Sequence, residues 1–445
     1  MSGGRGRRSV TWTTDYYAPW CPGGSSESVR LLARAVARSV DLTIVTPAWG
    51  AAPLEERIDG VRVVRFPTGL TLPPMATAPD PVTMSSRFQR AARRTIEAVG
   101  GELVHAQDRR LLGAAVAAAR ATGARILLTL RDVGLLCPIA TCLLDRDTVP
   151  DDCGQRRLWS TCAPEHAQRY GAAPRLKLAV KYGRLARDRR LALDGVGFVS
   201  DGLRRVYGSA GWPPARTPTA VLPSPVEDVP PMDESAHRHV DACFTNGWGL
   251  QRFDPVCGYA TAFFQPVVLY VGKPSIGKGW AMFSAAAERL YGRAKFVQVG
   301  SPPAEHQYVV SYDGVDHANA LRWIRSAAIV CVPAQNQDAL PRVALEAAMQ
   351  ERPVVGTRVG GIPEIVAHGE TGLLVRPGDV DGFVFAVRSL LDSPLTAEAM
   401  GLNARQYISE RFSEAVCADK VVELYEQIAS LRSGAPERAH ERARP

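Results

Sequence analysis

Two strand-turn-helix signals follow one another in Asp338-Ala-Leu-Pro-Arg-Val-Ala-Leu-Glu346 and Pro353-Val-Val-Gly-Thr-Arg-Val-Gly-Gly-Ile-Pro-Glu-Ile-Val366. Leu340-Pro341 marks the start of the first helix, because proline is tolerated where the first amides of a helix have no partner. Free amides at a helix N-terminus attract an anion, most often a phosphate. Glu346 then lies about 1.5 turns into this helix.

The second signal contains a buried strand over residues 353–357, a turn at Gly360-Gly361 and a short helix that Pro363 opens. Gly369 can end this helix, because glycine readily adopts the left-handed backbone of a helix end. Two neighbouring helix starts with glycines and flanking carboxylates suit a sugar nucleotide. The amides would hold the diphosphate, and the acids would hold hydroxyl groups.

This stretch resembles the donor-binding signature of the retaining glycosyltransferases of family 4 (glycosyl transferases group 1). Their pattern is a Glu, seven residues, a second Glu, and then a Gly-Gly-Ile-Pro-Glu segment. The resemblance implies an α/β chain of the GT-B fold, with two Rossmann-like domains facing each other across a deep cleft. Asp338 stands where the first Glu is usual, and its side chain is one methylene shorter. The alternative is that Asp338 only caps the helix and that Glu346 lies on a solvated face.

Length and composition are those of a globular protein of two domains. The chain has 445 residues and an apolar share of 46%, and it contains no run of 18 apolar residues that would span a membrane. The Gly- and Arg-rich residues 1–9 are not followed by the apolar core of a signal peptide. We therefore expect a cytoplasmic protein whose nine cysteines are reduced thiols.

The charge is unevenly divided between the two halves. Residues 1–225 contain 32 Lys and Arg against 19 Asp and Glu, a net charge of +13, whereas residues 226–445 contain 21 against 26, a net charge of −5. The first half therefore carries a basic surface, which indicates an anionic partner on that side. A nucleic acid is not expected, because no motif that reads nucleic acid is found there.

The first domain, residues 1–225, begins with a β-loop-α-β unit whose loop contains Gly23-Gly24. Ligands of parallel sheets lie beyond the carboxyl ends of the strands, where this loop falls. Family members have a similar loop near the acceptor and the donor phosphate, although Gly23-Gly24 could also be a plain turn. Residues 60–66 alternate in the manner of an edge strand.

Further acceptor-side candidates follow in this domain. His105 lies near the end of the next strand, and Arg131-Asp132 follows the strand 125–130. Many relatives read Leu-His-Asp at this second place, with the His against the donor sugar or the acceptor. Arg131 is permanently charged and cannot exchange protons, so we expect it to bind phosphate or sugar. The alternative is an ion pair with Asp132 or Asp108.

Two features of the first domain leave alternatives open. Cys137, Cys142, Cys153 and Cys162 lack a Cys-x-x-Cys pair, so buried thiols are favoured over a zinc knuckle. The helix Arg175–Leu193 is basic and amphipathic. It would either lie on an anionic membrane, as a peripheral contact at the inner face, or present an ordinary solvated face.

Residues 226–265 form a linker with an insertion of unknown role, and residues 266–410 form the second, donor-binding domain. Lys273 and Lys278 flank its first loop, where relatives have Gly-Arg and Lys-Gly and where the two cations clamp the diphosphate. Gly279 follows Lys278, so this loop is not a P-loop, which requires Ser or Thr there. Residues 411–433 should form a helix that crosses back to the first domain, and 434–445 a disordered tail.

The resemblance implies a retaining transfer from a nucleotide-sugar, most often a UDP- or GDP-sugar, without metal or other cofactor. Lys273, Lys278 and the helix start at Leu340, Pro341 and Arg342 would hold the diphosphate. Asp338 would hold the sugar and Glu346 the ribose, with Gly24 at the phosphate.

The acceptor could be a glycan, a lipid-linked sugar or a small molecule, bound near Gly23, Gly24, His105, Arg131 and Asp132. A sugar-nucleotide epimerase of the same fold and a non-catalytic partner protein remain as alternatives. The sequence does not identify the base, the sugar, the acceptor or the oligomeric state.

Overall fold

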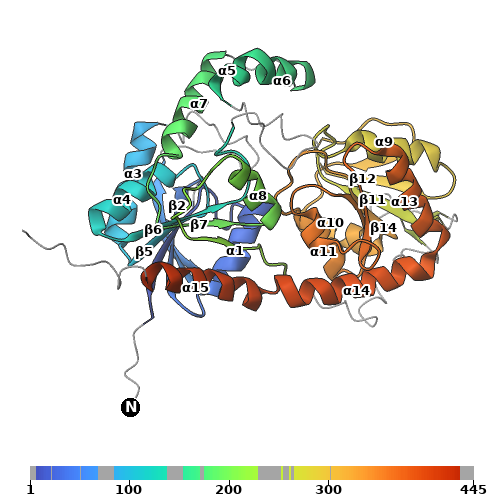
Figure 1. The fold of residues 1–445 in the computed structure, drawn as a ribbon. Helices are drawn as coiled ribbons and strands as arrows, with labels where there is room; N and C mark the ends of the chain where they lie inside the picture. The colour runs from blue at the N-terminus through green and yellow to red at the C-terminus, as the bar shows by residue number, and fades with distance from the viewer. Residues whose placement is uncertain are drawn as a thin grey trace, which may run out of the picture.

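The computed structural model describes residues 7–21, 23–50, 52–68, 85–137, 154–170, 175–228, 252–253, 260–261, 265–300 and 302–430. In these residues two large sheets lie side by side, each flanked by helices (Figure 1). This arrangement is the two-domain α/β fold expected from the sequence.

The first sheet has eight strands in the order β3-β4-β2-β1-β5-β6-β7-β8. Its strands are β1 (Ser9–Thr13), β2 (Asp41–Ala48), β3 (Glu55–Ile58), β4 (Val61–Pro67), β5 (Leu103–Ala106), β6 (Arg125–Leu130), β7 (Gly195–Phe198) and β8 (Thr219–Val221). All neighbours are parallel except β3 and β4, which pair antiparallel. The prediction of an edge strand at 60–66 was therefore wrong, because β3 folds back and covers that edge.

Helices pack on both faces of this sheet (Figure 1). The helices of the first domain are α1 (Gly24–Val36), α3 (Ser86–Val99), α4 (Leu112–Thr122), α5 (Gln155–Arg157), a π-helical turn (Leu158–Cys162), α6 (Ala163–Tyr170), α7 (Arg175–Asp188) and α8 (Asp201–Ser209). Of these, α5 and α6 stand away from the sheet, at the top of the view in Figure 1. One apolar cluster contains residues of α3, α4 and α8, and a second contains residues of α1. The strands are apolar along most of their length because a parallel sheet is buried on both faces.

The second sheet has six parallel strands in the order β13-β12-β11-β14-β15-β16. They are β11 (Val267–Val271), β12 (Lys295–Val299), β13 (Val309–Tyr312), β14 (Ile329–Val332), β15 (Val354–Thr357) and β16 (Gly372–Val375). The accompanying helices are α9 (Trp280–Arg289), α10 (His317–Ser326), α11 (Arg342–Met349), α12 (Ile362–Ile365), α13 (Val380–Asp392) and α14 (Pro394–Phe412).

The chain returns to the first domain at its end. Helix α14 packs against α11 and α13, and α15 (Glu414–Ser430) packs against α1 and β8. The two helices run one after the other along one side of both domains (Figure 1). On α15, the hydroxyl of Tyr425 accepts a hydrogen bond from Trp12 Nε1 at 2.7 Å, which joins this helix to the central strand β1.

The linker predicted at 226–265 lies almost entirely outside the described residues. Within it, β9 (Arg252–Phe253) and β10 (Ala260–Thr261) form a two-stranded antiparallel ribbon. The tail predicted at 434–445 lies outside the described residues as well.

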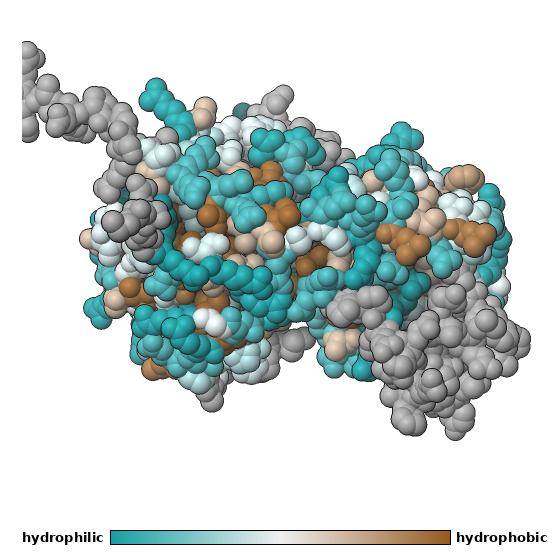
Figure 2. Space-filling model, turned by 90° about the horizontal axis from the view of Figure 1, so that it is seen from below, coloured by the Kyte–Doolittle hydropathy of each residue, from teal (hydrophilic) through white to brown (hydrophobic). Residues whose placement is uncertain are grey.

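No helix in the described part of the chain is long and apolar enough to cross a bilayer. On the face that Figure 2 shows, hydrophilic residues predominate and apolar ones form small separate patches. The contact of Arg175–Leu193 with an anionic membrane stays a prediction that none of these observations tests.

Candidate functional site

The carboxylate of Glu346 is held by an arginine and a histidine. Helix α11 has Pro341 as its N-cap, and Glu346 is only 7% exposed on this helix. Its Oε1 accepts hydrogen bonds from Arg342 Nε at 3.1 Å and lies 3.0 Å from His317 Nε2. The hydrogen bond to Glu346 raises the pKa of His317. All contacts found for this carboxylate among the described residues use Oε1, so Oε2 remains available to a ligand hydroxyl.

Asp338 and Lys278 meet just before α11. Lys278 Nζ lies 2.5 Å from Asp338 Oδ2, although the two residues belong to different loops of the second domain. Gly279, at the N-cap of α9, has φ +73°, and a Cβ there would lie 1.7 Å from the carbonyl oxygen of Pro333. Only glycine allows the loop of Lys278 to approach the loop of Asp338 this closely.

The same two loops meet at Asn336, a partly buried residue whose side-chain oxygen is buried. The carbonyl oxygen of Gly277 accepts hydrogen bonds from the amides of Gln335 and Asn336 at 2.9 and 3.2 Å. Asn336 Oδ1 is buried and has no hydrogen-bond partner among the described residues. The unsatisfied acceptor thus belongs to a residue that contacts Gly277, the neighbour of Lys278, and that precedes Asp338 by two positions.

Lys273, the other predicted clamp residue, is exposed, and no ion pair is found for it in the described part of the chain. Leu340 is partly buried and packs against the cores of both domains. The start of α11 therefore lies where the two domains meet.

Gly360 and Gly361 pack against the backbone of Asp338, and the Gly361 amide is used within the protein. The Gly361 amide donates to the Asp338 carbonyl oxygen at 2.9 Å. Gly360 has φ +59°, and a Cβ there would lie 2.1 Å from the same oxygen. The expectation that the amides and acid of this second turn suit a sugar nucleotide was therefore wrong for Gly361 and Glu364. The Glu364 carboxylate accepts instead from the amides of Asp201 and Gly202 in the first domain.

The Gly23-Gly24 loop reaches helix α11 of the second domain across the domain boundary. A Cβ on Gly24 would lie 2.9 Å from Arg342 Cδ, whereas nothing lies within 4 Å of one on Gly23. Arg342 Nη1 also lies 3.4 Å from Ser28 Oγ on α1. The structure thus brings Gly24 together with Arg342 and Glu346, as the sequence predicted for one site.

Arg131 is held by neutral groups. Its Nη2 donates to Gln107 Oε1 at 2.8 Å and its Nη1 to Ser224 Oγ at 2.9 Å. Its Nε is buried and has no partner among the described residues, and burial lowers the pKa of Arg131 to about 10. A pKa of about 10 still keeps the Arg131 guanidinium positively charged at neutral pH.

The alternative of an ion pair between Arg131 and Asp132 or Asp108 was wrong. Asp132 Oδ1 accepts from the Gly134 amide at 2.7 Å, and Asp108 accepts from the amides of Asp15 and Arg110. The side chain of Asp132 is 64% exposed, so it stays open to solvent beside Arg131.

The assignment of His105 to the acceptor side was wrong. Its ring is fully buried and lies 2.7 Å from the Tyr425 hydroxyl and 2.6 Å from Thr129 Oγ1. Burial lowers the pKa of His105, which keeps the ring neutral. The side chain points to the sheet face that α15 covers, and Gln107, two residues later, reaches the strand end instead.

Buried thiols were favoured over a zinc site for four cysteines, and of these Cys162 is a buried free thiol and Cys137 a partly buried one. Cys142 and Cys153 lie outside the described residues. No group of His, Cys, Asp and Glu side chains that could hold a metal ion is found within the described residues.

Sequence reasoning missed several residues at this site. Gln107 follows a strand at its carboxyl end, a signal that could have identified it. His317 and Ser224 carry no local signal, because only the packing of distant segments brings them to Glu346 and Arg131.

Comparison with known families divides the chain at the same place as the two sheets. Residues 23–224 match the model of the glycosyl transferase 4-like domain, and residues 265–393 match that of the glycosyl transferases group 1.

Among curated relatives, the α-maltose-1-phosphate synthase of Mycolicibacterium smegmatis is 32% identical over 189 residues, 37% of this chain and 49% of the relative. The D-inositol 3-phosphate glycosyltransferase of Corynebacterium efficiens is 39% identical over 117 residues, 26% of this chain and 27% of the relative. The chain spans about half or less of the length of these relatives.

Solved structures share the fold over nearly the whole chain. The sucrose-phosphate synthase from Thermosynechococcus elongatus has a TM-score of 0.67 at 19% identity, covering 96% of this chain and 100% of the other. Anabaena HepE in complex with UDP-glucose has a TM-score of 0.60 at 17% identity, covering 96% and 99%. At these identities the likeness establishes the GT-B fold.

Proposed function

This chain belongs to the glycosyltransferases of the GT-B fold, and we propose that it moves a sugar from a nucleotide-sugar donor to an acceptor with retention of configuration. The observation that carries this proposal is the Lys278–Asp338 pair at 2.5 Å, just before the start of α11. A cation, a carboxylate and free helix amides at one place match the diphosphate and hydroxyl groups of such a donor.

The donor diphosphate is placed at the N-terminus of α11. The first amides of this helix have no partner within the helix, and its dipole favours negative charge. Lys278 would leave Asp338 for the phosphate when the donor binds, and the exposed Lys273 would add a second cation. The structural neighbour Anabaena HepE has been solved in complex with UDP and with UDP-glucose, so UDP-sugars are the first donors to test.

The acids have separate roles in this proposal. Asp338, once Lys278 moves to the phosphate, would accept hydrogen bonds from the hydroxyls of the donor sugar. Glu346 would bind the ribose through Oε2, since Arg342 and His317 occupy Oε1. Fixing the sugar in this way positions the reacting carbon at the acceptor.

Transfer would pass through an oxocarbenium-like state in which the leaving nucleoside diphosphate gains charge. Lys278 and the α11 amides stabilise that charge as it develops. Retention follows if the acceptor hydroxyl attacks the same face and gives its proton to the leaving phosphate. No metal takes part in these steps.

The acceptor side is proposed at the loop of Gly24 and at Arg131-Asp132. Arg131 is too basic to exchange protons, and its unsatisfied Nε suits an anionic or hydroxyl-rich group. Asp132, exposed beside it, can accept acceptor hydroxyls.

The test is a panel of UDP-, GDP- and ADP-sugars incubated with the purified chain and candidate acceptors, with release of nucleoside diphosphate as the readout. We expect turnover with at least one donor and its loss in Asp338→Ala. If a folded sample binds none of these donors, the proposal is refuted. Conversion of a donor without acceptor would favour the epimerase. Donor binding without turnover, combined with intact cellular function in Asp338→Ala, would favour the non-catalytic partner.

A further inference from the structure

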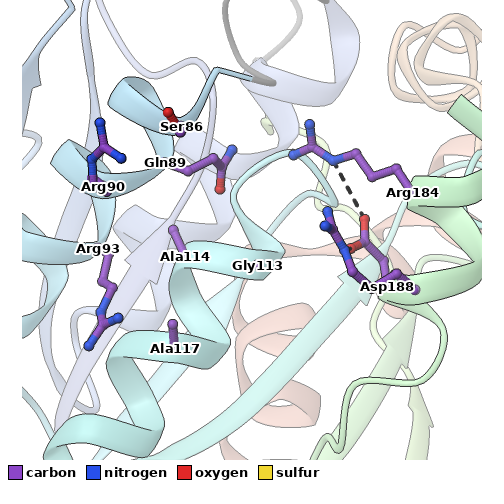
Figure 3. Close-up of a pocket in the computed structure, with 10 residues that line it drawn as sticks. Ser86, Gln89, Arg90, Arg93, Gly113, Ala114, Ala117, Arg184 and Asp188 are labelled. Carbon is purple, nitrogen blue, oxygen red and sulfur yellow. Dashed lines mark ion pairs between the residues drawn. The ribbon is translucent and has the colours of Figure 1, made fainter. Parts of the chain in front are cut away.

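A groove of about 370 Å³ opens on the first domain between α3, α4 and α7. Figure 3 shows Arg90 and Arg93 on α3 at one side, Arg184 and Asp188 on α7 at the other, and α4 between them. The residues placed at the donor in the second domain do not line this groove. Its volume falls within the range of small-molecule sites.

The walls of the groove carry an excess of positive charge. Among the described residues, four arginines line it, namely Arg90, Arg93, Arg184 and Arg187, together with one carboxylate, that of Asp188. Arg184 and Arg187 each have Nε 3.8 Å from that carboxylate, and Arg184 Nη2 also lies 3.4 Å from the Arg110 carbonyl oxygen. Asp188 is thus shared by two guanidinium groups.

The two arginines of α3 differ in their contacts. Arg93 pairs with Glu97 one turn further along the helix at 2.6 Å, and Glu97 is not part of the groove lining. Arg90 is exposed, and the described residues offer it no ion pair. A cation without a partner at the rim of a concave site favours an anionic ligand.

The floor is apolar because α4 presents small residues there. Gly113, Ala114 and Ala117 leave the space between the two arginine-bearing helices unfilled (Figure 3). A larger side chain on α4 would fill the groove. The site thus combines a cationic rim with a small apolar floor, which suits a phosphate group attached to a compact organic body.

The groove is connected to the acceptor side of the first domain. Gln89 Nε2 donates to the carbonyl oxygen of Arg110 at 2.9 Å, and the Arg110 guanidinium pairs with Asp15, in the loop that leads to Gly24. Gln107, which holds Arg131, and Gly113 are six residues apart, so they lie at most about 20 Å from each other.

We propose that this groove is a second anion site, separate from the donor site, which binds the phosphate monoester of a small molecule. A phosphate monoester carries a charge of about −1.5 to −2 at neutral pH. That charge matches the excess of the arginines. Planar guanidinium groups can each donate two hydrogen bonds to the oxygens of one phosphate. This geometry favours a phosphate over an anion of the same charge and another shape.

The test measures binding of glucose 6-phosphate to the full chain by calorimetry, without donor, so that the result does not depend on transferase activity. We expect Arg90→Ala/Arg93→Ala to weaken binding about tenfold or more. The matched control is Arg87→Ala/Arg94→Ala, which removes the same charge from the same helix at exposed positions outside the groove. It should keep the affinity of the wild type.

Two further variants locate the binding. Ala117→Leu keeps every arginine and fills the floor, so it should abolish binding. Lys278→Ala alters the proposed donor site and should leave binding of glucose 6-phosphate unchanged. Any of three results would overturn the proposal. The two double variants could lose affinity for glucose 6-phosphate equally, Ala117→Leu could bind it as the wild type does, or Lys278→Ala could lose binding.

Controls with other probes separate the chemical classes. Inorganic phosphate should bind with the same dependence on Arg90 and Arg93, and glucose should not bind. Vesicles of phosphatidylglycerol serve as the membrane probe, with phosphatidylcholine vesicles as their control. Binding of the anionic vesicles through Arg90 and Arg93, without binding of glucose 6-phosphate, would show a membrane surface and refute the small-molecule site.

Discussion

The carboxylate of Glu364, in the second domain, accepts a hydrogen bond from the amide of Gly202, in the first domain, at 2.8 Å. Its other oxygen accepts from the Asp201 amide at 3.0 Å, so both oxygens cap the start of α8. Gly202 is required at this contact, because a Cβ there would lie 2.1 Å from the carbonyl oxygen of Gly360. The Gly-Gly-Ile-Pro-Glu segment therefore fixes one domain against the other.

We predict that Glu364→Ala destabilises the chain by about 0.5–2 kcal/mol, the usual cost of losing a helix cap. Glu364→Gln should cost less, because its amide oxygen still accepts one of the two bonds. Thermal unfolding measures both effects, and small-angle scattering should show a larger radius of gyration for Glu364→Ala. The exposed Glu370→Ala is the control. If Glu364→Ala matched this control in both measurements, the capping role would be refuted.

Gly24 and Gly23 should differ sharply on substitution. In Gly24→Ala the new Cβ would meet Arg342 at 2.9 Å, so Arg342 would move and release its hold on Glu346. We expect kcat/KM to fall about tenfold, a loss of about 1.4 kcal/mol. Gly23 has φ −169°, which any residue adopts, and open space around it. Gly23→Ala should keep full activity, and equal losses in the two variants would contradict the assignment.

Lys278 and Asp338 should separate binding from turnover. Lys278→Ala removes a charged hydrogen bond to the donor diphosphate and should weaken nucleotide affinity about 10- to 100-fold. Asp338→Asn should keep or improve nucleotide affinity, because the neutral side chain no longer competes with the diphosphate for the Lys278 ammonium. The same variant should lower kcat on the order of 100-fold, because the donor sugar is no longer positioned. Calorimetry with UDP and steady-state kinetics test both. The same loss of UDP affinity in both variants would argue against these roles.

Arg131→Met should leave stability unchanged or raise it while it removes turnover. The arginine is largely enclosed, and its Nε has no partner in the described part of the chain, so the folded state bears a desolvation cost. Methionine fills similar space without that cost. Unfolding curves and kinetics on the same preparation decide the matter. A clear loss of stability with full activity would show that Arg131 has a structural role only.

His317 should make stability depend on pH. The hydrogen bond to Glu346 raises its pKa in the folded chain above the ordinary value of 6.5. The folded state then binds the proton more tightly than the unfolded state. The contribution is complete below about pH 6.5 and is lost as the pH rises through the folded-state pKa.

Urea unfolding of wild type and His317→Gln from pH 5 to pH 9 measures this contribution. The wild type should be the more stable at low pH, and the difference should disappear at high pH. A difference that grows with rising pH would contradict the pairing with Glu346.

The sequence predicted the strand-turn-helix signals of residues 338–366 because these signals are local. The proline before α11 and the eight-residue spacing of Asp338 and Glu346 are features of one short segment. A helix start or a left-handed turn is decided by such short-range sterics, so it can be predicted without knowledge of the fold.

The sequence could not assign the partners of these residues. His105 looked like a site residue at a strand end, yet Tyr425, 320 residues away, closes over it. Arg131 received Gln107 and Ser224 as partners, not the acids beside it in sequence. Such pairings depend on which sheet face a distant helix covers.

The sequence by itself therefore determined the two-domain α/β fold and the proline-led helix that follows Asp338. Only the tertiary structure decided that Glu364 joins the domains, that His317 shares Glu346 with Arg342, and that three helices leave a groove lined by arginines. The physical reason is range. Backbone geometry is set by neighbours in the chain, whereas burial and charge pairing are set by segments that meet only after the chain has folded.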